Sequence, residues 1–315
     1  MHYQSFTVMA NTKIAFLILP KIHLLDFAGP DQVFYEAIDY GADIELEYCC
    51  LNDQNETSTR FPIGQLKHYN EVKLKKGDYL LIPGSDTHHL LSEEIRSQKD
   101  LFEWLKMAHA TGVNLCSICT GAYVLALAGL LDNRKCTTHW KHTAKLQTLF
   151  PETQVIENIL FVEDEGITTS AGVTSGIDMA LNIVSTLNGE LFSYKVAREL
   201  VVYSRRQGNQ AQQSIYLQYR NHIHSGIHKV QDWIQENTDK KSNLADLGEI
   251  ACMSTRNLTR IFKKETGISI NEFTTLIRKE KLKTLLKLPD VSRKQMAIEC
   301  GLKSERQIIR LIRQA

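Results

Sequence analysis

A cysteine stands where a buried apolar segment meets a run of small residues. Cys119 follows the apolar segment 113–118, and Gly121 comes two positions later. A sharp turn from strand to helix exposes a nucleophile at a helix N-terminus, whose dipole lowers the pKa of a thiol. The pattern therefore predicts a reactive thiol at Cys119. A buried structural cysteine fits the same local sequence equally well.

Two more polar side chains follow apolar segments and could act together with this thiol. Asp26 is a lone acid among apolar residues, which is typical of a loop carboxylate or of a partly desolvated functional group. His139 could act as a base or as a hydrogen-bond partner of Cys119; in the structural alternative it packs beside Trp140. Cys116 and Cys119 have C-x-x-C spacing, but the sequence has no second such pair, so we expect no metal site and no cofactor.

Short apolar runs alternate with helical patterns over the first part of the chain. The runs span residues 14–19, 44–51, 79–83 and 113–118, and the helical patterns span residues 30–40, 100–110 and 120–130. This alternation predicts an α/β domain, a flavodoxin-like parallel sheet with helices on both faces. Ligands of such sheets bind at the carboxyl ends of the strands, where Asp26, Cys119 and His139 are expected.

These segments together resemble a known family. Residues 117–131 (SICTGAYVLALAGLL) closely resemble the cysteine elbow of the PfpI-like branch of class I glutamine amidotransferase-like domains. Residues 24–30 resemble the first loop of that branch, residues 137–140 its Thr-Thr-His-Trp segment, and residues 168–178 a hallmark of GlxA-type regulators. The resemblance implies that Cys119 is the elbow thiol, that Asp26 contacts it and that His139 lies nearby.

One turn departs from the pattern of that family. Gly84 is followed by Ser85, where the family usually has a second glycine. Backbone N–H groups of this turn could hold an anion or an oxyanion, and the serine restricts the backbone there. We expect a small-molecule effector to bind in a pocket lined by six residues. They are Asp26, Gly84, Ser85, Cys119, Thr120 and His139.

The 315-residue chain has a formal net charge of +1, which hides an uneven distribution. Residues 1–207 carry 18 Lys and Arg against 25 Asp and Glu, a net charge of −7. Residues 208–315 carry 19 against 11, a net charge of +8. A basic final part suggests that it binds nucleic acid, the alternative being two domains that differ by chance.

The overall composition excludes several classes of protein. The chain is 43% hydrophobic and 23% charged, which is ordinary for a globular protein and excludes wholesale disorder. No apolar run approaches the roughly 18 residues that a membrane span needs. Seven cysteines, an odd number, indicate reduced thiols, so we expect a cytoplasmic protein.

The last hundred residues show helical patterns only. Ser254 can cap a helix with Leu258 and Phe262 on its apolar face, and a short helix precedes it across a break near Cys252. Two short helices with a tight turn and a basic outer face fit a helix-turn-helix. The layout recurs after residue 292. A basic helical bundle with solvated cationic faces is the alternative.

From about Ile227 onward the chain resembles AraC/XylS-type DNA-binding domains. The matching features include Met253-Ser254, Arg260-Ile261-Phe262, Gly267, Arg278 and Cys300-Gly301-Leu302. The resemblance implies that exposed polar side chains of two recognition helices contact DNA. These residues are Arg256, Asn257, Arg260, Lys263, Arg306, Gln307 and Arg310.

Two departures from the AraC/XylS pattern are informative. Gly248 stands where that family favours alanine, which costs up to ~1 kcal/mol in a helix. The customary Gly-x-x-Pro segment after the second recognition helix is missing from the sequence, which stops at Ala315. We therefore expect the last helix to fray.

Four regions are predicted: an N-terminal tail (1–12), a PfpI-like ligand-sensing domain (13–207), a linker (208–224) and an AraC-type DNA-binding domain (225–315). The expected function is a homodimeric, sequence-specific transcriptional regulator that senses a small metabolite and does not bind membranes. The alternative is a cysteine-dependent enzyme, such as an amidase, a deglycase-like enzyme or an isonitrile hydratase, with a basic accessory domain. A non-catalytic scaffold is a third hypothesis.

The uneven charge leads to a first testable prediction. Because the acidic part repels DNA, residues 208–315 alone should bind random DNA more tightly than the whole chain at low salt. Titration of both proteins against one labelled duplex at several salt concentrations measures this difference. Equal affinities at low salt would show that the charge distribution has no such role.

Overall fold

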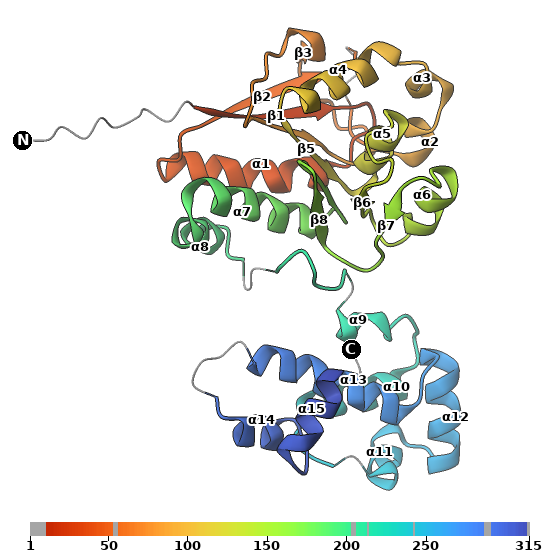
Figure 1. Ribbon diagram of the computed structural model, residues 1–315. Coiled ribbons are helices and arrows are strands. Elements are labelled where there is room, and N and C mark those ends of the chain that lie inside the picture. The colour runs from red at the N-terminus through yellow and green to blue at the C-terminus, as the bar shows by residue number, and fades with distance from the viewer. Residues whose placement is uncertain are drawn as a thin grey trace, which may run out of the picture. The chain divides into compact units, whose positions relative to one another are not determined.

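The computed structural model describes residues 11–52, 56–202, 206–212, 214–241, 243–286 and 291–313, without the side chains of residues 216, 217, 310, 312 and 313. The chain divides into two compact units, Met1–Gln212 and Gln213–Ala315 (Figure 1). Most of the predicted tail, residues 1–10, lies outside the described residues.

The first unit is built on a seven-stranded sheet with the order β3-β2-β1-β4-β5-β9-β8. Every neighbouring pair is parallel except β8 and β9. The strands are β1 (Thr12–Ile18), β2 (Ile44–Cys50), β3 (Lys67–His68), β4 (Tyr79–Ile82), β5 (Asn114–Ile118), β8 (Phe161–Asp164) and β9 (Ile167–Ser170). A separate small sheet pairs β6 (Lys135–Cys136) with β7 (Gln154–Val155).

Helices cover both faces of the large sheet, as Figure 1 shows. One apolar core joins the sheet to α1 (Leu24–Asp39), α7 (Thr174–Asn188) and α8 (Glu190–Glu199). The other joins it to α4 (Lys99–Ala110) and α5 (Ala122–Leu127). The short helices are α2 (Thr87–Leu90), α3 (Glu93–Arg96) and α6 (Thr143–Leu149), and residues 69–71 form a 3₁₀ turn. The predicted α/β class, with a mostly parallel sheet, is confirmed.

Two local expectations were wrong. The segment expected to be a loop at residues 24–30 is helical, because α1 begins at Leu24 and places Asp26 in its first turn. The helix expected over residues 120–130 begins instead with a 3₁₀ turn, Cys119–Gly121, and α5 ends at Leu127.

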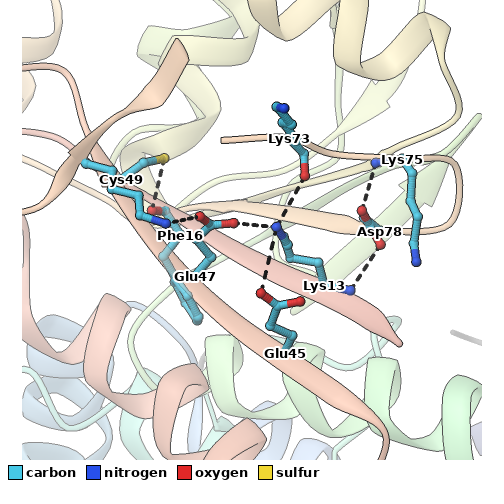
Figure 2. A network of polar contacts seen from close by, with 9 residues as sticks. Lys13, Phe16, Glu45, Glu47, Cys49, Lys73, Lys75 and Asp78 are labelled. Atoms are coloured by element: carbon cyan, nitrogen blue, oxygen red, sulfur yellow. Dashed lines mark hydrogen bonds and ion pairs between the residues drawn. The ribbon is translucent and has the colours of Figure 1, made fainter. Parts of the chain in front are cut away.

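A polar network joins the amino ends of three strands, away from the carboxyl ends (Figure 2). The Lys13 ammonium donates to Glu47 at 2.6 Å and to the carbonyl of Lys73 at 3.3 Å. The buried carboxylate of Asp78 accepts the backbone N–H groups of Lys13 and Lys75 at 3.0 and 2.7 Å. These bonds hold the amino ends of the strands together. The candidate site lies at the opposite, carboxyl ends.

The second unit consists of helices in the part of the chain that the structure describes. They are α9 (Ile215–Gln218), α10 (Ser225–Glu236), α11 (Leu244–Ala251), α12 (Thr255–Thr266), α13 (Ile270–Leu285), α14 (Arg293–Glu299) and α15 (Glu305–Arg313). One core packs α10 to α13 together, and a smaller one packs the end of α13 against α14 and α15. Two helix pairs, α11–α12 and α14–α15, therefore lie on either side of α13 in sequence.

Arg278 links segments of this unit that are far apart in sequence. Its guanidinium donates to the carbonyls of Thr238 and Lys240 at 3.1 and 2.7 Å. Gly301, in the turn after α14, comes so close that a methyl group there would lie 2.7 Å from the guanidinium and 2.6 Å from the Thr238 carbonyl. Arg278 therefore fixes the second helix pair against the segment that precedes the first pair.

None of the described helices combines the length and the apolar character that crossing a membrane requires. All seven cysteines are free.

The elbow needs a glycine at position 121, and this is testable. A β-carbon on Gly121 would lie 2.1 Å from the carbonyl oxygen of Ile82. Gly121→Ala should therefore lower the free energy of unfolding by about 2–3 kcal/mol, because backbone must move to make room. Gly64→Ala is the control, since nothing lies within 4 Å of the new methyl group. Urea unfolding followed by circular dichroism measures both, and equal stabilities would contradict the close contact.

Candidate functional site

Cys119 sits at the carboxyl end of β5 in an uncommon backbone conformation. Its φ is +55°, a region that side chains rarely adopt, and the residue is 4% exposed. Two glycines make room for it: a β-carbon on Gly172 would lie 2.1 Å from Cys119 Cβ, and one on Gly84 would lie 2.9 Å from the same atom. The ends of β4, β5 and β9 therefore converge on this thiol, as the sheet topology predicts.

Asp26 is the charged residue of a side-chain cluster that also contains His23 and Cys119. It is 1% exposed, and its Oδ1 accepts the backbone N–H of Val173 at 2.5 Å. Its Oδ2 lies 3.3 Å from Nδ1 of His23, and the Cys119 thiol donates a hydrogen bond to the carboxylate. Asp26 therefore joins the first turn of α1 to the elbow and to the loop before α7.

The surroundings of Cys119 favour the buried structural cysteine over the activated thiol, the two alternatives that the sequence left open. Burial raises the pKa of the Cys119 thiol well above its usual value, and the negative charge of Asp26 raises it further. A hydrogen bond from the Thr120 backbone acts in the opposite direction but is outweighed. The helix dipole expected to lower the pKa is also weak here, because the elbow is a 3₁₀ turn and α5 has only six residues. Cys119 is therefore a hydrogen-bond donor rather than a thiolate.

In the turn at Gly84 and Ser85, considered for holding an anion, the N–H of Ser85 already has a partner. The Ser85 N–H donates to Thr120 Oγ1 at 2.9 Å, and that hydroxyl donates back to the Ser85 carbonyl at 2.7 Å. The Ser85 hydroxyl donates to the carbonyl of Pro20, and the residue is fully buried. These bonds leave the Ser85 N–H occupied, so the serine locks the turn.

His139 is partly buried beside the cluster, and its ring packs 5.6 Å from that of Trp140. Burial lowers the pKa of His139, Lys141 lowers it further, and the charge of Asp26 acts in the opposite direction. The packing beside Trp140 matches the structural alternative. The charge of Asp26 reaches His139, but the imidazole nearest to Asp26 is that of His23.

Sequence reasoning missed His23. The signal that could have found it is its position three residues before Asp26, a spacing that places two side chains on one side of a helical turn. Within the described residues, His23, Asp26 and Cys119 form one group whose possible metal-ligand atoms all lie within 4.8 Å of one another. Zinc binds thiolate, and the raised pKa of Cys119 opposes loss of its proton. Hydrogen bonds account for this group without an ion, and the expected absence of a metal stays a prediction.

The residues of the site are buried, but several residues next to them in the sequence are exposed. Asp26, Ser85, Cys119 and Thr120 are each at most 4% exposed. Leu24, Trp140 and Val173, which adjoin cluster residues in the chain, are 44%, 44% and 39% exposed. Val173 is also strained, with φ +52° at a β-branched residue. The loop at Val173 therefore combines exposure, backbone strain and a bond to the buried Asp26.

The first helix pair of the second unit has the geometry of a helix-turn-helix. Cys252 ends α11 in the left-handed conformation, and the Ser254 hydroxyl accepts the N–H of Asn257 at the start of α12. Gly267 ends α12, also left-handed. Gly248 allows the close packing of the turn between α11 and α12, because a β-carbon there would lie 2.7 Å from the Met253 carbonyl. Its cost in helix propensity is thus linked to a close backbone contact.

The side chains predicted to contact DNA lie largely in solvent. Arg256, Arg260 and Lys263 are exposed on α12, while Asn257 is partly buried and accepts a hydrogen bond from Arg260 at 2.9 Å. On α15, Arg306 and Gln307 are exposed, and Gln307 accepts the N–H of Lys303 at 2.7 Å. The side chain of Arg310 lies outside the described residues.

The fold and the site define an α/β domain with a buried cysteine at a strand-to-helix elbow, followed by a helical unit with a helix-turn-helix. The model of the DJ-1/PfpI family matches residues 12–186, and a helix-turn-helix domain model matches residues 247–315. The chain belongs to the DJ-1/PfpI family and also carries a helix-turn-helix domain.

Individual proteins resemble this chain over different lengths. The HTH-type transcriptional regulator CdhR of Pseudomonas aeruginosa is 28% identical over 291 residues, which is 92% of this chain and 84% of that protein. The isonitrile hydratase of Pseudomonas putida is 28% identical over 178 residues, 56% of this chain and 72% of the enzyme. Several further HTH-type regulators are matched over only 52–61% of their length.

Among solved structures, an AraC family transcriptional regulator from Pseudomonas putida superimposes with a TM-score of 0.53. The sequence identity is 21%, and the superposition covers 60% of this chain and 99% of the other. At this identity the likeness concerns the fold of the first unit.

The raised pKa of Cys119 gives a prediction about reactivity. Iodoacetamide at pH 8 should modify the exposed Cys252 well before Cys119, because alkylation requires an accessible thiolate. Asp26→Asn should speed alkylation of Cys119 about 10-fold for each unit by which the pKa falls, since it removes the opposing negative charge. Peptide mass spectrometry follows both sites, with Asp43→Asn, an exposed acid elsewhere in the unit, as control. A native Cys119 that reacts faster than Cys252 would contradict the buried hydrogen-bonded thiol.

Proposed function

We propose that the chain is a DNA-binding transcriptional regulator whose DJ-1/PfpI domain binds a small-molecule effector. The observation that carries this proposal is the exposed basic face of α12 on a capped helix-turn-helix. Residues 13–207 are the sensing domain, residues 208–224 the linker and residues 225–315 the DNA-binding domain. CdhR, matched over nearly the whole chain, is named as a regulator of the same type.

Direct base contacts come first from α12. Arg256 and Arg260 are exposed guanidiniums that can bond guanine, and Asn257 can bond adenine once Arg260 releases it. Lys263, near the end of the helix, suits a phosphate. Arg306, Gln307 and Arg310 play the corresponding part on the second pair, where Gln307 must first release the Lys303 N–H.

The effector site is the cluster around Cys119, lined by Asp26, Gly84, Ser85, Thr120 and His139. The buried carboxylate of Asp26 suits a ligand that carries a hydrogen-bond donor or a positive charge, because such a group can replace the donors that Asp26 holds now. A thermal-shift screen of small nitrogen metabolites tests this, since a ligand at 100 times its dissociation constant adds about 2.7 kcal/mol of stability. The expected hit loses its effect in Asp26→Asn.

A cysteine-dependent enzyme is the second candidate, supported by the match to an isonitrile hydratase and by the retained Cys119, Asp26 and His139. The raised pKa of Cys119 speaks against it, because a nucleophilic thiol needs a lowered pKa or a base in contact with it. We also propose a cytoplasmic homodimer, since two symmetric copies suit paired half-sites on DNA.

A substitution on α12 tests the DNA-binding role. Arg260→Ala should weaken binding to the protein's own promoter region about 10-fold or more, because one bidentate contact contributes about 1–3 kcal/mol of discrimination. Lys229→Ala, an exposed cation on α10, should change the affinity much less. Gel-shift titration at fixed salt measures both. The proposal fails if the native chain shows no preference for its promoter over random DNA.

A further inference from the structure

The polar segment 206–212, called the strap below, is bonded to the first unit at its start. The Arg206 guanidinium donates to Asp178 Oδ2 at 2.9 Å from Nε and at 2.6 Å from Nη2. Nη2 also donates to Thr174 Oγ1 at 2.8 Å, and the Arg206 N–H donates to Asp178 Oδ1 at 3.0 Å. Asp178 is buried on α7, whereas the Arg206 side chain is 34% exposed, so this ion pair is only partly shielded from water and salt.

The middle and the end of the strap are bonded as well. The Leu160 N–H donates to the carbonyls of Gly208 and Gln210 at 2.8 and 2.9 Å. Gly208 packs so closely that a β-carbon there would lie 2.5 Å from the carbonyl oxygen of Phe161. The Gln212 side-chain amide donates to the Thr138 carbonyl at 2.9 Å. The strap is therefore fixed at three places along its length.

Each of these three places adjoins a group that touches Asp26 or Cys119. Thr174, bonded by Arg206, directly follows Val173, whose N–H is held by Asp26. Thr138, bonded by Gln212, donates its hydroxyl to the Cys119 carbonyl at 2.7 Å.

The middle connection runs through Leu160. Its carbonyl accepts the N–H of Ala171 at 2.7 Å, and Ala171 precedes Gly172, which packs on Cys119. The strap is thus linked to the surroundings of Cys119 and Asp26 by three routes, two through a direct bond to Thr174 or Thr138 and one through Leu160 and Ala171.

We propose that the strap is the output element of the Cys119 site, released or held according to what Asp26 and Cys119 bind. A ligand that takes the Asp26 carboxylate must displace the Val173 N–H or the thiol, and this moves the loop that carries Thr174 and the elbow that carries Thr138. The bonds of Arg206, Gln210 and Gln212 then weaken, and the chain that continues into the second unit gains freedom. The proposal rests on the proposed function for the site, and adds the route by which occupancy is transmitted.

Coupling of this kind is reciprocal, because a free-energy link between two sites acts in both directions. Disturbing Asp26 must loosen the strap, and loosening the strap must make Cys119 more accessible. A strap that only packs against the unit would respond to its own substitutions and to nothing at Asp26.

Hydrogen exchange measured by mass spectrometry on the full-length chain tests the first direction. In Asp26→Ala, the amides of Leu160, Phe161 and residues 206–212 should exchange about 10-fold faster than in the native chain. Asp43→Ala, an exposed acid in the same unit, should leave them unchanged. Exchange in folded Asp26→Ala that stays within twofold of the native rates overturns the proposal.

Alkylation tests the second direction and does not depend on the folding of Asp26→Ala. Arg206→Gln should raise the rate at which iodoacetamide modifies Cys119 about 10-fold, whereas Arg198→Gln, an exposed arginine on α8, should not. Equal rates in the two variants overturn the proposal.

DNA affinity separates this inference from the proposed function. Faster exchange in Asp26→Ala together with unchanged affinity for the promoter supports the coupling of the strap to Asp26 and overturns regulation of DNA binding from this site. Changed affinity with unchanged exchange overturns the strap alone.

Discussion

The first unit depends on one buried charge. A carboxylate out of water is costly unless donors surround it, and Asp26 collects its donors from three separate segments: the turn before α1, the elbow at Cys119 and the loop at Val173. Cys119 and Val173, which both bond to this carboxylate, have positive φ, and a β-carbon on Gly84 would lie 2.5 Å from Asp26 Oδ2. The strained residues of the site are thus partners of one buried carboxylate.

The same interaction decides the chemistry of the thiol. A carboxylate beside a cysteine can orient the thiol, or it can raise the pKa of the thiol and so lower its reactivity. Burial decides which effect is larger. Here water is excluded, so the negative charge of Asp26 and the loss of solvation act in the same direction and hold Cys119 protonated. A protonated thiol is a weak nucleophile, so in this structure the elbow acts as a buried, hydrogen-bonded link between β5 and the first turn of α1.

The sequence is informative wherever the cause is local. The alternation of strands and helices, the Ser254 and Gly267 caps of α12 and the convergence of Asp26 and Cys119 follow from short patterns, and the structure shows them. The prediction failed where a residue far away in the sequence determines a hydrogen bond or a pKa. The N–H of Ser85 is taken by Thr120, 35 residues away, and the pKa of Cys119 depends on a carboxylate from another element. His23 was missed because its role arises only when the segment at 24–30 is helical.

The strap shows that a polar sequence does not by itself indicate a solvated linker. A run rich in Gln, Asn and Gly has almost no apolar surface to bury, so its sequence indicates a solvated connection. Yet side-chain amides and the glycine backbone form hydrogen bonds with protein carbonyls and N–H groups as readily as with water. Gln212 and Gly208 use this property against Thr138 and Leu160. Because each such bond exchanges one water partner for one protein partner, its net free energy is about 1 kcal/mol. Bonds of that size hold the middle and the end of the segment, in addition to the Arg206–Asp178 ion pair at its start. For the proposed transmission from the Cys119 site, such bonds suit the segment better than an apolar interface, which no single ligand could open.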